Sequence, residues 1–222
     1  MNPIIVALDV PTLDEARALT STIGDAAGMY KIGLEQFMAH GPDAVRAIDS
    51  HPVFLDVKLH DIPTTVARAL TALQPLALKM VNVHALGGRA MLEAASSVKG
   101  DSRLLAVTIL TSLDDPALKE LGLPPAQDAV VNLALLAKDS GCDGVVCAPT
   151  DIEGVRETCG EDFLIVTPGV RPAGSAMDDQ ARTLTPRQAL DAGADYLVIG
   201  RPITRASDPR AAAAAIYEEM YA

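Results

Sequence analysis

The sequence predicts a single α/β domain over residues 1–222, folded as a closed (β/α)8 barrel of the TIM type. Eight short apolar runs rich in β-branched residues alternate with segments whose apolar spacing is typical of helices. No linker interrupts this alternation. Eight strand–helix units in a chain of 222 residues favour a closed barrel over an open doubly wound sheet, which more often has five or six strands.

The eight apolar runs are the expected strands, taken in chain order. They are residues 4–8, 30–33, 53–57, 80–84, 104–110, 144–148, 163–167 and 196–200. Between them the apolar spacing lengthens to three or four residues, as at Val66, Leu70 and Leu73, which indicates helices. A weak internal repeat, GCDGVVCA against GADYLVIG, supports the same strand-after-turn organisation near the sixth and eighth strands.

Two helix starts carry capping signals. Thr12 is followed three residues later by Glu15, and Thr185 by Gln188, which is the spacing of a capping box. Pro186 then occupies the first helical position, where a missing N–H does no harm. We therefore expect helices to begin directly after Thr12 and Thr185.

Composition excludes several classes of protein. With 49% hydrophobic and 21% charged residues, the chain is expected to fold around a sizeable core. A net charge of −11 without a basic stripe disfavours binding to nucleic acid or to an anionic membrane. No apolar run approaches the roughly 18 residues of a membrane span, and the first residues lack a basic region, so a cytoplasmic location is expected. The three cysteines, Cys142, Cys147 and Cys159, lack disulfide or zinc spacing and are expected in the core.

Three charged side chains interrupt the apolar stretch FLDVKLHDIP. Because successive side chains of a strand point to opposite faces, Asp56 and Lys58 are expected on one face and the intervening residues on the other. One face of a barrel strand looks inward, and the carboxyl ends of the strands form the rim where barrel enzymes place their active sites. Asp61 follows in the loop. The pattern predicts a charged cluster at this rim.

The same residues also fit structural roles. Asp61 could cap the helix that follows, and Asp56 and Lys58 could form a structural ion pair. Removing charges from water is costly unless each is well partnered, which argues against keeping them for stability alone. Lys31 and Asp9 also lie at strand ends. Five ionisable groups on one rim favour a functional site.

A phosphate site is expected on the same rim, in the loops after the seventh and eighth strands. These loops begin TPGVRP and IGRPI. Gly169 and Gly200 allow close backbone approach, although ordinary turns explain each of them individually, and Arg201 offers a bidentate clamp. The 173–185 segment is long for a loop of a compact domain, which favours a lid, and its Gln180 amide could reach a phosphate.

The segment DVKLHDIPTT matches the pattern D-x-K-x-x-D-I-x-x-T of the orotidine 5′-monophosphate decarboxylase family, which the chain resembles over nearly its whole length. Further motifs occur in the order typical of that family: ALDV, KIGLE, VNVHALGG, TILTS, TPGVRP, a glutamine in the long loop, and VIGRP. The resemblance implies conversion of orotidine 5′-monophosphate to uridine 5′-monophosphate, the last step of pyrimidine nucleotide synthesis. It also implies a homodimer with shared active sites and no metal or organic cofactor.

The resemblance further assigns roles to individual residues. Lys58 is implied as the proton donor to C6, with Asp56, Lys31 and Asp61 completing an alternating charge network in which Asp61 crosses the dimer interface. The implied substrate-binding residues are Asp9 and Lys31 at the ribose, Asp56 of the charge network, Ile62 and Thr65 reaching the partner's site, Thr111 and Ser112 by the pyrimidine, and Arg171, Gln180, Gly200 and Arg201 at the phosphate.

Two other functions stay open on the sequence. A phosphosugar enzyme of related barrel type, such as a 3-keto-gulonate 6-phosphate decarboxylase or a hexulose phosphate synthase, would share D-x-K-x-x-D but use magnesium and an enediolate. The continuation Ile62-Pro63 and Thr65 speak against it. A catalytically inactive nucleotide-binding barrel is the second alternative, and the intact charged positions of the motif argue against it.

Overall fold

The computed structural model describes residues 2–48, 51–171 and 184–221, and its eight parallel strands close into a barrel. The strands are β1 (Ile4–Ala7), β2 (Met29–Gly33), β3 (Val53–Leu59), β4 (Met80–His84), β5 (Arg103–Val107), β6 (Gly144–Val146), β7 (Leu164–Pro168) and β8 (Tyr196–Ile199). Each strand pairs with the next in sequence, and β8 returns to pair with β1. The predicted (β/α)8 barrel and all eight predicted strands are confirmed.

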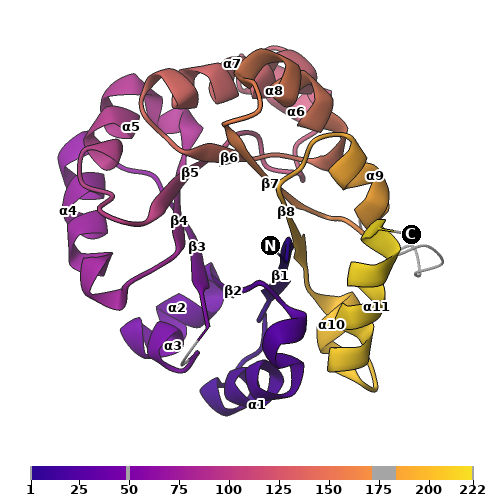
Figure 1. Ribbon diagram of the computed structural model, residues 1–222. Coiled ribbons are helices and arrows are strands. Elements are labelled where there is room, and N and C mark those ends of the chain that lie inside the picture. The colour runs from indigo at the N-terminus through magenta and orange to yellow at the C-terminus, as the bar shows by residue number, and fades with distance from the viewer. Residues whose placement is uncertain (1, 49–50, 172–183, 222) are drawn as a thin grey trace.

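Helices form an outer ring around the strands, and the N-terminus lies inside this ring beside β1 (Figure 1). The helices are α1 (Leu13–Ile23), α2 (Leu34–His40), α3 (Pro42–Arg46), α4 (Pro63–Leu73), α5 (Gly88–Ser96), α6 (Asp115–Glu120), α7 (Ala126–Asp139), α8 (Ile152–Cys159), α9 (Pro186–Asp191), α10 (Arg201–Thr204) and α11 (Pro209–Tyr221). Short 3-10 turns are η1 (Gly24–Ala26), η2 (Gln74–Leu76), η3 (Ala85–Gly87) and η4 (Pro149–Asp151). None of the helices in the described ranges is both long and apolar enough to span a bilayer.

The two predicted helix starts are present, with different capping. Thr185 and Gln188 form a complete capping box before α9, with Pro186 in the first turn. Thr12 accepts a hydrogen bond from the Glu15 amide at 3.2 Å before α1, which is half of the predicted box. Both side chains satisfy amide groups that a helix start leaves without a partner.

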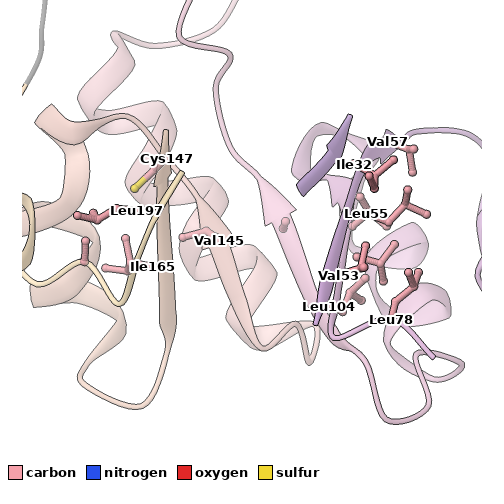
Figure 2. Close-up of a cluster of buried hydrophobic side chains, with 14 of the residues drawn as sticks. Ile32, Val53, Leu55, Val57, Leu78, Leu104, Val145, Cys147, Ile165 and Leu197 are labelled. Carbon is pink, nitrogen blue, oxygen red and sulfur yellow. The ribbon is translucent and has the colours of Figure 1, made fainter. Parts of the chain in front are cut away.

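The core has two layers because side chains alternate along each strand. The larger layer lies between strands and helices, and Figure 2 shows Val53, Leu55 and Val57 following one another along one side of β3. The second layer fills the barrel with residues of the opposite set, including Phe54, Met80 and Leu105. The three cysteines are buried and free, as predicted.

The internal repeat has a structural basis at the amino-terminal ends of the strands. Asp143, in the turn before β6, accepts hydrogen bonds from the Leu104 amide and from Lys99 at 2.8 and 2.6 Å. Asp195, at the matching position before β8, accepts from the Ile165 amide and from Arg156 at 2.7 and 2.8 Å. Each carboxylate ties its turn to the start of the preceding strand, on the face opposite the predicted site.

Candidate active site

A cavity of about 640 Å³ opens at the carboxyl ends of the strands. Eight of the site residues that the family resemblance implies line it: Asp9, Lys31, Asp56, Lys58, Thr111, Arg171, Gly200 and Arg201. Apolar side chains complete the wall, among them Phe54, Ile109 and Leu110. The lining therefore carries both a charge cluster and two arginines, around a volume that suits a small ligand.

The charged residues form a connected network on β2, on β3 and in the loop after β1. Lys58 Nζ lies 2.7 Å from Asp56 Oδ1, and Lys31 Nζ lies 3.5 Å from Asp56 Oδ2. Lys31 also donates to Asp9 Oδ1 at 3.1 Å. Negative and positive groups thus alternate from Asp9 to Lys58. This arrangement brings together four of the five groups that the sequence places on the rim.

Asp56 stands at the centre of the network, and only 14% of its side chain is exposed. Burial alone would raise the pKa of this carboxyl. The charges of Lys31 and Lys58, together with hydrogen bonds from Lys58 and Asn82, outweigh burial and hold the pKa below the ordinary value of 3.8. Asp56 is therefore ionised at neutral pH, and its carboxylate pairs with both lysines.

Lys58 reaches the cavity through an irregular backbone rather than through simple strand alternation. The strand runs on to Leu59, two residues beyond its predicted end, and its register with β4 shifts between Leu55 and Leu59. Lys58 has φ 51°, a left-handed conformation that is unfavourable for a residue with a side chain. The expected face for Asp56 and Lys58 is confirmed, but a bulge and not the regular pleat aims the lysine.

Asn82 of β4 belongs to this site, although the sequence motifs did not single it out. Its side chain is fully buried, donates to Asp56 Oδ1 at 2.6 Å and accepts from the Lys58 amide at 2.8 Å. The available signal was a polar residue in the middle of the apolar run MVNVH. A buried amide needs hydrogen-bond partners, which indicates a neighbouring polar group.

Two glycines and two arginines line the cavity after β7 and β8. Gly169 has φ 79°, a conformation that favours glycine, so the turn chemistry weighed for this residue does apply. The Arg171 amide donates to the Leu184 carbonyl at 3.1 Å, which places these two residues side by side. Arg201 begins α10, directly after Gly200. The predicted contact of Gln180 lies outside the described residues, as does most of the expected 173–185 lid.

Four predicted site residues lie outside the cavity of their own barrel. Asp61, Ile62, Thr65 and Ser112 are all exposed, and 64% of Ile62 is accessible to solvent. Asp61 accepts a hydrogen bond from the Ile62 amide at 2.6 Å, and it makes no ion pair with the described residues. Asp61 therefore does not cap α4, the structural role that its position also fits, since the N-cap residue is Ile62 and no side chain caps this helix.

His84 is the histidine expected near the site, at the end of β4. Its ring stacks on that of His60, with 5.3 Å between the ring centroids. Burial is the main cause that lowers the pKa of His84 below its ordinary value, and His60 and Lys58 lower it further. The neutral ring therefore adds no charge beside Lys58. In the described ranges, no three His, Cys, Asp or Glu side chains are grouped so that they could hold a metal ion.

Comparison with known proteins agrees with this geometry. The profile of the orotidine 5'-phosphate decarboxylase / HUMPS family matches residues 2–216. An orotidine 5'-phosphate decarboxylase of Trichlorobacter lovleyi is 52% identical, covering 100% of this chain and 96% of the relative. One of Moorella thermoacetica is 51% identical, covering 99% and 92%.

Solved structures give the same result. The crystal structure of orotidine 5'-phosphate decarboxylase from Lactobacillus acidophilus superposes with a TM-score of 0.88 at 39% identity over all of both chains. That from Pyrococcus horikoshii gives 0.83 at 26% identity over 99% of both chains. With its profile, relatives and barrel in agreement, the chain belongs to the orotidine 5'-phosphate decarboxylase / HUMPS family.

Proposed function

We propose that this chain is a carboxy-lyase that converts orotidine 5′-monophosphate to uridine 5′-monophosphate, with Lys58 as the proton donor. The observation that carries the proposal is the network Lys31–Asp56–Lys58, which lines the same cavity as Arg171 and Arg201. A nucleotide with a charged base and a 5′-phosphate has two separated anionic ends, and the cavity offers cations on β2 and β3 and again after β7 and β8. The relatives at about half identity carry the name of this activity.

The chemistry requires stabilisation of charge at one carbon. The bond from C6 to the carboxylate breaks, its electron pair stays on C6, and carbon dioxide leaves. A proton then passes from Lys58 Nζ to C6, and the neutral amine regains a proton from water. The pyrimidine ring delocalises this carbanion poorly, so a fixed ammonium aimed at C6 is the natural stabiliser. Asp56 holds the Lys58 ammonium by an ion pair, with 2.7 Å between Lys58 Nζ and Asp56 Oδ1.

The remaining contacts follow the roles that the family resemblance implies. We place the ribose at Asp9 and Lys31, the pyrimidine near Thr111, and the phosphate at Arg171 and Arg201, with Gly200 beside them. Guanidinium groups suit a phosphate because they donate two parallel hydrogen bonds. Ser112 and Gln180 stay predictions, since one is exposed outside the cavity and the other lies outside the described residues.

We propose a homodimer in which Asp61, Ile62 and Thr65 of one chain complete the site of the other. Three observations support this arrangement. These residues are exposed directly after the strand that carries Asp56 and Lys58. Large apolar side chains are exposed at Ile62 itself, at 64%, and on α2, which follows the neighbouring strand β2, with Leu34 at 50% and Met38 at 70%. A second cavity of about 210 Å³ opens beside Lys31 and Leu34, which could receive a partner's loop.

The proposal includes no metal or organic cofactor, because Lys58 supplies the proton and the network supplies the charge. A net charge of −11 and a cavity of nucleotide size support a small-molecule substrate rather than nucleic acid. Location in the cytoplasm and independence of membranes stay predictions.

An absorbance assay tests the proposed reaction. Purified protein is mixed with orotidine 5′-monophosphate, with and without EDTA, and the product is identified by chromatography against uridine 5′-monophosphate. We expect equal turnover in both conditions. Turnover that EDTA abolishes, or activity on 3-keto-gulonate 6-phosphate with added magnesium in its place, would favour the related phosphosugar chemistry. A folded protein without turnover would favour the inactive nucleotide-binding barrel.

A further inference from the structure

Asn82 occupies a position in β4 from which it contacts the Asp56 carboxylate and the backbone of Lys58. Its Nδ2 donates to Asp56 Oδ1 at 2.6 Å, and its Oδ1 accepts from the Lys58 backbone amide at 2.8 Å. The side chain is fully buried, and within the described part of the chain it is not among the residues that line the cavity. It can therefore act on the reaction only through Asp56 and Lys58.

The register between β3 and β4 explains why Lys58 needs such a partner. Leu55 pairs with Val81 and Leu59 pairs with Val83, so residues 56–58 of β3 stand opposite Asn82 alone. In a regular parallel ladder, the Lys58 amide would donate to a backbone carbonyl of the next strand. In this bulge the Asn82 side chain takes the place of that carbonyl, at the residue whose φ is 51°.

We propose that Asn82 is a positioning residue for catalysis, which holds the Asp56 carboxylate and the left-handed Lys58 in one fixed geometry. This inference rests on the proposed decarboxylase function. An amide side chain is suited to the position because it donates and accepts at the same time. Serine is shorter, leucine does neither, and an ionised aspartate cannot donate. Loss of the amide frees Asp56 to rotate and leaves the Lys58 amide without its partner, so that Nζ is no longer aimed at C6.

Two variants separate this role from a contribution to folding. Asn82→Ala removes both hydrogen bonds. Asn82→Asp keeps the shape and the acceptor for the Lys58 amide but loses the donor toward Asp56. The matched control is Thr108→Val on the neighbouring β5 side of the barrel, which deletes a buried hydrogen bond of 3.1 Å to the Val146 carbonyl. This control removes a comparable internal bond without touching the charge network.

The readout compares turnover with binding. For both Asn82 variants we expect kcat to fall by roughly 10- to 100-fold, which corresponds to about 1.4 to 2.8 kcal/mol, while KM changes by less than about threefold because the phosphate contacts persist. Affinity for a uridine monophosphate analogue with an anionic oxygen on C6 should fall by a similar factor. Affinity for uridine monophosphate itself should hardly change, since it places no charge at C6.

The aspartate variant adds a pH signature. At position 82 a carboxyl group would face Asp56 and Lys58 of β3, with Lys31 of β2 bonded to Asp56 and His84 two residues along β4. On β5 its register partner is the apolar Leu105. Protonation of the new carboxyl restores a donor toward Asp56. The ratio of wild-type kcat to that of Asn82→Asp should therefore shrink as the pH falls from 8 to 5.

Several outcomes would overturn the inference. If Asn82→Asp retains more than half of the wild-type kcat, or if the two ligands lose affinity equally, Asn82 has only a structural role. If the ratio of wild-type kcat to that of Asn82→Asp stays constant between pH 8 and 5, the hydrogen bond that Asn82 donates to Asp56 does not contribute to catalysis. An equal kcat loss in Thr108→Val would assign the effect to general destabilisation. Should Asn82→Ala fail to fold, the isosteric aspartate variant decides the question. Failure of the underlying function is distinguishable, because the wild type itself would then neither turn over the substrate nor prefer the anionic analogue.

Discussion

Replacing Lys58 with alanine removes the ammonium that lies 2.7 Å from Asp56 Oδ1 on the cavity wall. A unit charge about 4 Å from the charge that develops on C6 contributes about 4 kcal/mol at an effective dielectric constant of 20, which is roughly three decades of rate. The variant also loses its proton donor, an effect of about 10²- to 10⁴-fold in general acid catalysis. The two losses share one group and do not simply add, so we expect kcat to fall by at least about a thousandfold.

Folding should survive this change. The Lys58 side chain is 36% exposed, and Asp56 keeps its contacts with Lys31 and Asn82. Partly exposed ion pairs contribute little, so the free energy of unfolding should change by less than about 1 kcal/mol. Near-wild-type affinity for uridine 5′-monophosphate would verify that the cavity is intact.

Initial rates of orotidine 5′-monophosphate loss, followed by absorbance, measure the effect. Lys119→Ala serves as the control, because Lys119 is an exposed lysine of α6 outside the cavity lining. More than about a hundredth of the wild-type kcat in Lys58→Ala, a loss of under about 3 kcal/mol, would remove Lys58 from the central role.

Three further predictions concern binding, assembly and stability. Arg201→Ala should lower kcat/KM for the 5′-phosphate substrate by at least about 100-fold, but should alter kcat/KM for the bare nucleoside by less than about threefold. Arg205 does not line the cavity, so Arg205→Ala should leave both values unchanged. Equal losses of kcat/KM for the two substrates in Arg201→Ala would make Arg201 structural. A mixture of Lys58→Ala and Asp61→Ala dimers should regain roughly a quarter of wild-type activity per site, because random reassortment gives about half heterodimers with one intact site each. If native mass spectrometry shows chain exchange but no activity returns, the shared-site model is refuted. Burial alone would raise the pKa of Asp143, but hydrogen bonds from Lys99, the Leu104 amide and Arg103 outweigh burial and lower this pKa below 3.8. The ionised carboxylate therefore stabilises the fold fully above the unfolded pKa of 3.8, and this stabilisation is lost as the pH falls through the lower folded pKa. In urea unfolding, the difference in free energy of unfolding between wild type and Asp143→Asn should vanish in that acid range. A difference that stays constant with pH would contradict this role of Asp143.

The barrel could be predicted because its pattern is local. Each strand is a short apolar run of β-branched residues, and each is found within a few residues of its predicted position. The errors are at the carboxyl ends. The fifth predicted strand reaches Leu110, but β5 ends at Val107. Ile109 and Leu110 line the cavity instead of continuing the strand pairing. Apolar character alone cannot separate a strand from an apolar wall.

The charged lining of the candidate site was predictable from the sequence, but its geometry was not. Charged residues at strand ends identified Asp9, Lys31, Asp56 and Lys58, because charge in an apolar strand has few structural explanations. The left-handed backbone at Lys58 and the bond from Asn82 depend on the register between two strands, which no single segment encodes. Sequence spacing gives neighbours along the chain, whereas a bulge is a property of a pair of strands.

The central claim is that C6 carries the charge and receives the proton inside this cavity. Nuclear magnetic resonance of the wild-type protein with carboxyl-13C orotidine 5′-monophosphate in D2O with EDTA tests it most directly. We predict one labelled carbon dioxide or bicarbonate for each uridine 5′-monophosphate formed, with a single deuterium at C6, since the Lys58 ammonium exchanges its protons with solvent. Deuterium at C5, or retention of the labelled carboxylate by a folded protein, would contradict the account.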